Sequence, residues 1–217
     1  MAHLNIVSRS ISLIILIGLF YACNYNPKYK LPYIGQQTQE DGSIVEHTIR
    51  PFQFIDQDSN TVTNKTFGGK VYVTDFFFVS CPSICPLMTK QMLRLYRHYE
   101  NNPNVLFLSH TIDPRHDTVG RLKRYADKLG SVSSSKWHFV TGERDSIYSI
   151  ANDYFIAVQD ESNNGEDPNK LIHSGKFMLI DRTGHVRSFC DGTDPKAVDH
   201  FVFDIDQLLK EKENPSR

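Results

Sequence analysis

A strand that runs into two cysteines and then into a helix is the feature that most constrains the fold of this chain. Residues 71–79 form a β-branched and aromatic run, which is typical of a buried central strand. Cys81 and Cys85 follow this run, and each precedes a proline. Apolar residues then recur at helical spacing from Leu87 to Tyr99. The sequence therefore predicts a strand, a cysteine loop and a helix in direct succession.

Strands and helices alternate over most of the remaining chain. The segment 44–55 alternates in part, and the polar segment 160–170 carries turn signals that predict an exposed loop. The other predicted elements are strands at 105–110 and 137–140, helices from Asp117 or Thr118 to Gly130 and at about 146–154, a hairpin of 176–180 with 185–189, and a final helix at about 195–210.

This order of elements resembles a thioredoxin-like domain. We therefore expect an α/β protein with a thioredoxin-like fold, in which helices flank a central mixed β-sheet and a late β-hairpin precedes a C-terminal helix. No internal repeat or low-complexity block interrupts the pattern. A single domain over residues 44–213 is long enough to bury a full core.

The N-terminus is predicted to direct the chain out of the cytoplasm. Arg9 precedes an apolar run from 11 to 22, which is shorter than the ~20 residues that a membrane span needs. Residues 20–23 resemble a lipobox, so we expect a lipoprotein-type signal peptide at 1–22 and a lipid on Cys23. An uncleaved signal anchor is the alternative. Residues 23–43 are then a tether, and the domain faces the periplasm or another extracytoplasmic space, where thiols tend to be oxidised.

The charge of the chain disfavours nucleic acid as a partner. It has 24 basic and 25 acidic side chains, a net charge of -1 and a pI of about 6.7. A polyanion needs an excess of positive charge, which is absent from this sequence.

The setting of Cys81 and Cys85 favours reactive thiolates. A helix N-terminus carries partial positive charge and free N–H groups, which lower the pKa of nearby thiols. Because a residue before proline is pushed out of the α region, we expect the helix to begin at Pro86. Paired soft thiolates suit Cu(I), and an added imidazole gives a site that also holds Cu(II), whereas structural zinc needs four ligands. A structural disulfide that closes a small loop is the simpler alternative.

A third ligand has to come from another part of the fold. In thioredoxin-like domains, the loop before the first strand of the late hairpin approaches the cysteine loop and usually carries a cis-proline. Here residues 170–175 contain no proline, and His173 occupies that place. Of the nine histidines, only His173 has a topological reason to face the cysteines. An ordinary polar loop residue is the alternative.

Three segments together resemble the Sco/SenC family. They are Phe-Phe-Phe-Val-Ser-Cys-Pro-Ser-Ile-Cys-Pro at 76–86, Ile-Asp-Pro-Arg-His-Asp-Thr at 112–118 and His-Ser-Gly-Lys-Phe-Met-Leu-Ile-Asp at 173–181. Proteins of this family are membrane-tethered, bind copper, and assist assembly of the dinuclear copper centre of cytochrome c oxidase. The resemblance covers about residues 48–209.

By this resemblance, Cys81, Cys85 and His173 would be the ligands of Cu(I) or Cu(II). It also implies partners: the copper-accepting subunit of cytochrome c oxidase, and an envelope thiol reductant or copper donor. Two positions depart from the family pattern, since Ile172 replaces an acidic residue and Cys190 replaces an aromatic one. Cys190 is expected to be a small, half-buried strand residue, with an extra thiol near the site as the alternative.

The remaining candidates are given structural roles. Asp113 and Asp117 are expected to act in a turn and as a helix cap. Met88, Met92 and Met178 fit packing better than a copper-thioether site. No metal role is expected for the histidines that are scattered over different elements, namely His110, His116, His138 and His185.

Two functions compete on this evidence. The first is a metallochaperone, and the second is a thiol-disulfide oxidoreductase of the cell envelope that uses Cys81 and Cys85. Both need the reduced dithiol, so they are compatible in one protein. Whether the chain is an enzyme therefore stays open. A peroxiredoxin-like activity is disfavoured because Phe78 lies where the threonine of such enzymes would be.

Overall fold

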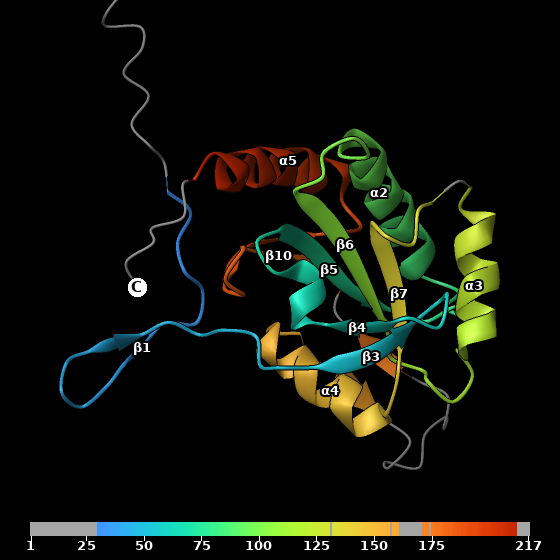
Figure 1. Cartoon of the computed structure of the whole chain (residues 1–217), viewed down its shortest axis with the longest axis horizontal. Helices are drawn as coiled ribbons and strands as arrows, with labels where there is room; N and C mark the ends of the chain where they lie inside the picture. Colours follow the sequence, from blue (N-terminus) through green and yellow to red (C-terminus); the bar gives the residue numbers. More distant parts are fainter. Residues whose placement is uncertain (1–29, 131, 157, 161–170, 174, 212–217) are drawn as a thin grey trace, which may run out of the picture. The chain divides into compact units, whose positions relative to one another are not determined.

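The computed structural model describes residues 30–130, 132–156, 158–160, 171–173 and 175–211. The chain from Leu31 onward forms one compact unit (Figure 1). The predicted signal peptide at 1–22, the lipid site Cys23 and most of the loop predicted at 160–170 lie outside the described residues. In the part that is described, no helix is long and apolar enough to cross a membrane.

A seven-stranded mixed sheet forms the centre of this unit. Its strand order is β11-β10-β5-β6-β7-β3-β4. The bounds are β3 Gln53–Asp56, β4 Thr61–Thr63, β5 Val71–Phe77, β6 Val105–Thr111, β7 Trp137–Thr141, β10 Lys176–Ile180 and β11 Val186–Asp191. Strands β5, β6 and β7 are parallel, and the flanking strands β10 and β3 run antiparallel to them. This confirms the predicted central mixed sheet.

Two short strand pairs lie outside this sheet. They are β1 (Gln37–Thr38) with β2 (Ile44–Val45), and β8 (Val158–Asp160) with β9 (Leu171–His173). The partial alternation at 44–55 therefore corresponds to β2 and β3, which belong to different sheets.

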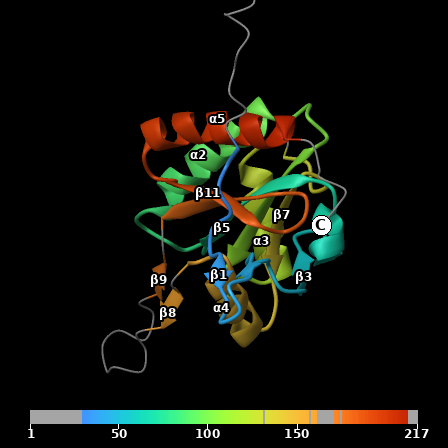
Figure 2. The same cartoon turned by 90° about the vertical axis from the view of Figure 1, so that its left-hand side faces the viewer.

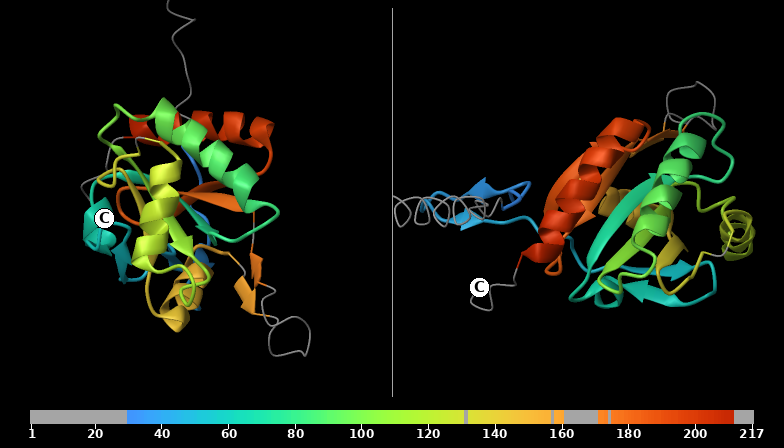
Figure 3. Two further views of the ribbon diagram at one scale, coloured as in Figure 1. Left: turned by 90° about the vertical axis from the view of Figure 1, so that its right-hand side faces the viewer. Right: turned by 90° about the horizontal axis from the view of Figure 1, so that it is seen from above.

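Helices cover both faces of the sheet, which explains why its middle strands are buried throughout. All residues of β5 and β6 are buried. Helices α2 (Cys85–His98), α3 (Val119–Lys128) and α5 (Pro195–Lys210) pack on one face, whereas α4 (Arg144–Asp153) and the 3-10 helix η1 (Asn64–Phe67) pack on the other (Figure 3). A strand that is buried on both faces does not alternate apolar and solvent-exposed polar residues, which agrees with the β-branched and aromatic run at 71–79.

The late hairpin is built as predicted, with β10 paired to β11. Its turn needs Gly184, which has φ +89°, and the Asp181 carboxylate accepts N–H groups of Thr183 and His185 across that turn. The final helix follows and packs on β11 (Figure 2). Its N-cap is Asp194, whose carboxylate accepts the N–H of Lys196. The bounds predicted for this helix are confirmed.

The segment that enters the domain is held by a buried arginine. Arg187 of β11 donates to the carbonyl groups of Leu31 and Pro32 and to the carboxylates of Asp181 and Glu211. Only 2% of the Arg187 side chain is exposed. Because a buried guanidinium needs partners for its donors, these contacts join the entering segment, the hairpin and the end of α5.

Candidate metal and redox site

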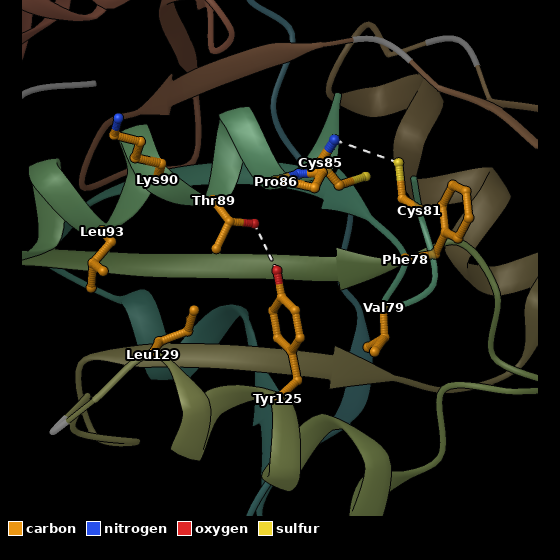
Figure 4. Close-up of a pocket in the computed structure, with 10 residues that line it drawn as sticks. All are labelled: Phe78, Val79, Cys81, Cys85, Pro86, Thr89, Lys90, Leu93, Tyr125 and Leu129. Atoms are coloured by element: carbon orange, nitrogen blue, oxygen red, sulfur yellow. Dashed lines mark hydrogen bonds between the residues drawn. The ribbon is translucent and has the colours of Figure 1, made fainter. Parts of the chain in front are cut away.

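The two cysteines lie where β5 ends and α2 begins. Parallel strands β5 and β6 end together, and the loop 78–84 then turns towards the first turn of α2. Ile84 precedes the helix and makes no side-chain cap. Instead, the N–H of Cys85 donates to the Cys81 sulfur across 3.4 Å, as the dashed line in Figure 4 shows. The sulfur of Cys81 therefore takes the place of a capping oxygen at this helix.

Helix α2 begins one residue earlier than the sequence predicts. Cys85, not Pro86, is its first residue, and Ile84 is already in the αR region with φ −82° and ψ −30°. A proline disfavours the α conformation of the residue before it but does not forbid it, and a proline in the first helical turn loses no hydrogen bond. The expectation of a non-helical loop up to Pro86 is therefore wrong.

The two sulfurs differ in their electrostatic environment. Partial burial raises the pKa of Cys81, but hydrogen bonds from the Cys85 thiol and from the backbone N–H groups of Ser83 and Cys85 outweigh it, so this pKa lies below its ordinary value. Deeper burial raises the pKa of Cys85, and the neighbouring Cys81 and Asp75 raise it further. Cys81 is 7% exposed and Cys85 2%. Cys81 is thus the more acidic and the more accessible thiol.

A buried carboxyl group, which the sequence analysis did not single out, lies within electrostatic range of the pair. Asp75 is on β5, and burial raises its pKa to about 7, although a hydrogen bond from Ser109 opposes this. Ser109 donates to Asp75 across 2.5 Å and accepts from the indole N–H of Trp137. The one signal in the sequence is that Asp75 is the sole acidic residue in the run 71–79.

Asp117 has a role other than the one predicted. The N-cap of α3 is Thr118, without a side-chain cap, and Asp117 caps no N–H of that helix. Its carboxylate accepts from the N–H of Val79 across 3.0 Å and from the hydroxyl of Thr111 across 2.6 Å. Because Val79 lies in the loop 78–84 that carries Cys81, Asp117 connects this loop to the end of β6. Asp113 behaves as expected and accepts within its own turn from His116.

The backbone near His173 approaches the cysteine loop. A Cβ added to Gly175 would lie 3.7 Å from the Cδ1 atom of Ile84, which is in that loop. His173 itself is the last residue of β9, where its backbone pairs with Val158, but its side chain and that of Ile172 lie outside the described part of the structure. Among the described side chains, no group of three or more His, Cys, Asp or Glu could hold a metal ion. The role of His173 as third ligand stays a prediction.

Cys190 is a buried strand residue, as predicted. It lies on β11 opposite Phe177, in the same apolar cluster as Cys81 and Cys85. Burial raises the pKa of Cys190 to about 12, and Asp191 and Asp204 add to this shift. A thiol with such a pKa is protonated and inert at neutral pH.

The scattered histidines and methionines have structural surroundings. His116, His138 and His185 contact Asp113, Asp56 and Asp181, respectively. His110 is enclosed by aromatic rings. The expectation that the methionines pack in the core is confirmed, since Met88, Met92 and Met178 are at most 2% exposed.

Comparisons with known proteins agree on one family. Residues 40–209 match the SCO1/SenC family. The chain is 31% identical over 173 residues to the SCO1 protein homolog of Bacillus subtilis, a match that covers 79% of this chain and 86% of the relative.

Solved structures show the same fold. A SCO1/SenC family lipoprotein from Bacillus anthracis superposes with a TM-score of 0.68 at 27% identity, over 82% of this chain and all of the other. BsSco, a member of the Sco family of cytochrome c oxidase assembly proteins in which a disulfide switch has been identified, superposes with a TM-score of 0.64 at 30% identity, over 76% of this chain and 95% of the other. The expected thioredoxin-like fold is therefore confirmed.

Proposed function

This chain belongs to the SCO1/SenC family, and from that membership we propose that it binds copper and delivers it to, or reduces the cysteines of, the dinuclear copper site of cytochrome c oxidase during assembly. Copper is a cargo in this proposal, and the acceptor is the copper-binding subunit of the oxidase. The described relatives support the assignment, because BsSco is a member of a family of cytochrome c oxidase assembly proteins.

The observation that carries the proposal is that two cysteine sulfurs lie together at the strand-to-helix junction. The N–H of Cys85 donates to the sulfur of Cys81, so both cysteines belong to one short loop. Two soft sulfur donors at one place fit Cu(I), and an imidazole from His173 would complete a site that also holds Cu(II). The approach of Gly175 to Ile84 supports His173 as that donor, because it brings the histidine's own segment to the loop.

The lower pKa of Cys81 supports a second activity on the same residues. A thiolate is needed both to bind metal and to attack a disulfide. In thiol-disulfide exchange, Cys81 would attack a disulfide of the partner, and Cys85 would then resolve the mixed disulfide. The disulfide switch identified in BsSco is consistent with such chemistry in a relative.

We place the protein at the outer side of a cell-envelope membrane. The apolar run at 11–22 and Cys23 would supply a signal peptide and a lipid anchor. Residues 23–43 would serve as a tether, which Arg187 holds to the domain at Leu31 and Pro32. The Bacillus anthracis relative is a lipoprotein, which supports an anchor of this type. Labelling cells with a radioactive fatty acid tests the anchor: the label should appear on the wild type and be lost in Cys23→Ala, and a labelled Cys23→Ala protein would contradict it.

Copper titration of the reduced full-length chain tests the main proposal. We expect one copper per chain in the wild type, and loss of tight binding in Cys81→Ser, Cys85→Ser and His173→Ala. Cys190→Ser is the matched control, because it removes a buried thiol of the same cluster and should keep full binding. If all three site variants bound copper as tightly as the wild type, the assignment would be wrong.

His173→Ala also separates the two activities. It should keep the reduction of a disulfide by Cys81 and Cys85, since no histidine takes part in that exchange, and it should lose copper transfer. Loss of both activities in a folded variant would contradict the division of roles between the cysteines and His173.

A further inference from the structure

An elongated groove between α2 and α3 begins at the cysteine pair. It encloses about 380 Å³, and Cys81 and Cys85 form one end of its lining (Figure 4). Leu93 of α2 and Leu129, just after α3, line the other end. Because Leu93 lies eight positions after Cys85 on a continuous helix, the groove extends about 12 Å from the sulfurs.

The lining of this groove suits apolar side chains. The hydroxyls of Thr89 and Tyr125 belong to the lining and hydrogen-bond to one another at 2.7 Å, so a ligand need not supply a polar partner for them (Figure 4). The ring of Tyr125 is held in place by Phe77 at 5.4 Å and Phe139 at 5.7 Å. A preformed, mostly apolar groove of this kind is typical of a binding site.

Both helices that form the groove carry basic residues. Lys90 lines it, and Arg124 and Lys128 immediately precede the lining residues Tyr125 and Leu129. Within the described part of the chain these three cations form no ion pair, whereas Arg94, Arg121 and Lys123 each contact an aspartate. Helix α2 has no acidic residue at all, although the whole chain has a net charge of -1. The positive charge is therefore local, and it attracts an acidic ligand.

From the position, lining and charge of the groove we infer that it docks the cysteine-bearing segment of the acceptor protein, through an apolar side chain within about four residues of the reactive cysteine and acidic residues beside it. This inference rests on the proposed function, which supplies an acceptor with cysteines. A segment whose sulfur meets Cys81 has to continue over the adjoining surface. An extended peptide covers about 12 Å in about four residues, which sets the spacing of the apolar side chain.

Thiol-disulfide exchange gives a direct readout of docking. The Cys81 thiolate attacks one sulfur of a peptide disulfide and forms a mixed disulfide, while the other peptide sulfur leaves as a thiolate. Cys85 then loses its proton and displaces the first peptide sulfur. The protein ends with a Cys81–Cys85 disulfide, and the peptide ends as a dithiol, so two electrons pass from protein to peptide.

The test uses the reduced full-length chain in nanodiscs of zwitterionic lipid and three synthetic peptides. Each peptide contains a Cys-x-x-x-Cys disulfide. The first peptide also contains a leucine four residues from the nearer cysteine and two aspartates beside it. The second peptide has serine in place of the leucine, and the third has lysine in place of the aspartates. The half-saturating peptide concentration is measured in single turnovers. Each exchange rate is also divided by the rate of the same variant with dithiodipyridine, a small neutral disulfide that needs no docking, which corrects for any change in the reactivity of Cys81.

We expect the serine peptide, or the variant Leu93→Ser with the first peptide, to raise the half-saturating concentration about tenfold, which corresponds to burial of one apolar side chain. Lys90→Glu should raise the half-saturating concentration of the aspartate peptide and lower that of the lysine peptide. This surface change keeps the test valid if Leu93→Ser is poorly folded. The controls are Phe203→Ser and Lys196→Glu on α5, which change one exposed apolar residue and one exposed lysine away from the groove. They should leave the half-saturating concentrations of all three peptides unchanged.

Equal half-saturating concentrations for all three peptides would overturn the inference and leave the proposed function standing, provided that the chain binds copper. A dimer of this chain that Leu93→Ser dissociates would also overturn it, because the occupant would then be a second copy. Absence of both copper binding and exchange would instead mean that the proposed function has failed, and the inference with it.

Discussion

The backbone N–H of Cys85 donates a hydrogen bond to the sulfur of Cys81, so one cysteine of the pair caps the helix that the other begins. This contact makes the two thiols unequal. The Cys81 sulfur receives N–H donors that stabilise its thiolate, whereas Cys85 is more deeply buried beside that charge. The order of events in any exchange reaction follows from this asymmetry, with Cys81 as the attacking and Cys85 as the resolving thiol.

The first prediction concerns selective alkylation. At pH 7, iodoacetamide should modify Cys81 in the Cys85→Ser variant about tenfold faster than Cys85 in the Cys81→Ser variant, because the thiolate is the reactive form. Quantitative peptide mass spectrometry measures both rates. Cys190, whose pKa is about 12, serves as an internal reference and should stay unmodified. Equal rates at Cys81 and Cys85 would contradict the asymmetry.

The second prediction concerns Asp75 and alkaline pH. Its pKa is raised to about 7 in the folded state, above the 3.8 of an exposed aspartate. Between these values the folded state holds a proton that the unfolded state has lost, so the contribution of Asp75 to stability is lost as the pH rises from 4 to 7. Asp75→Asn should therefore raise the free energy of unfolding at pH 8 by up to about 4 kcal/mol. Urea titrations at several pH values measure this difference, and a variant no more stable at pH 8 would contradict it.

The third prediction concerns His110 and acid pH. Burial lowers its pKa from 6.5 to about 3, and neither ring nitrogen has a hydrogen-bond partner among the described residues. Here the unfolded state holds the extra proton between pH 3 and 6.5, so stability falls as the pH falls through that range. His110→Phe should remove this loss, since a phenyl ring can keep the stacking on Phe76, whose ring lies 4.7 Å away.

The Asp75 and His110 effects oppose each other between about pH 4 and 6.5, so each variant is a control for the other. Asp75→Asn should become steeply less stable on acidification, by about 1.4 kcal/mol per pH unit, and His110→Phe should become more stable over the same interval. Parallel pH profiles for the two variants would contradict both assignments.

The fourth prediction concerns Arg187. Arg187→Met should lower the free energy of unfolding by about 3 to 5 kcal/mol, because it removes the buried guanidinium that donates to the carboxylates of Asp181 and Glu211. Trypsin should also cleave faster after Lys30, since the carbonyl of Leu31 loses its anchor. Arg94→Met is the matched control: its ion pair with Asp199 is exposed, so it should cost less than about 1 kcal/mol. Equal losses in the two variants would contradict the anchoring role.

Much of the fold could be predicted from local patterns. The strand before the cysteines, the late hairpin and the last helix each carry their own periodicity and their own turn or cap residues, such as Gly184 and Asp194. The start of α2 could not be placed exactly, because the preference of Cys85 before a proline is weak and packing overrides it. The role of Asp117 was also missed, since its partners Val79 and Thr111 belong to other elements.

The sequence by itself determined that two thiols stand between a buried strand and a helix, and its motifs indicated the family that the comparisons confirm. Only the tertiary structure decided how those thiols differ, that Asp75 is buried with a raised pKa, and that Tyr125 and Thr89 meet beside the pair. The physical reason is the distance along the chain over which each property is determined. Strand and helix periodicity depends on segments of about ten residues, whereas burial and electrostatic environment depend on elements that only folding brings together.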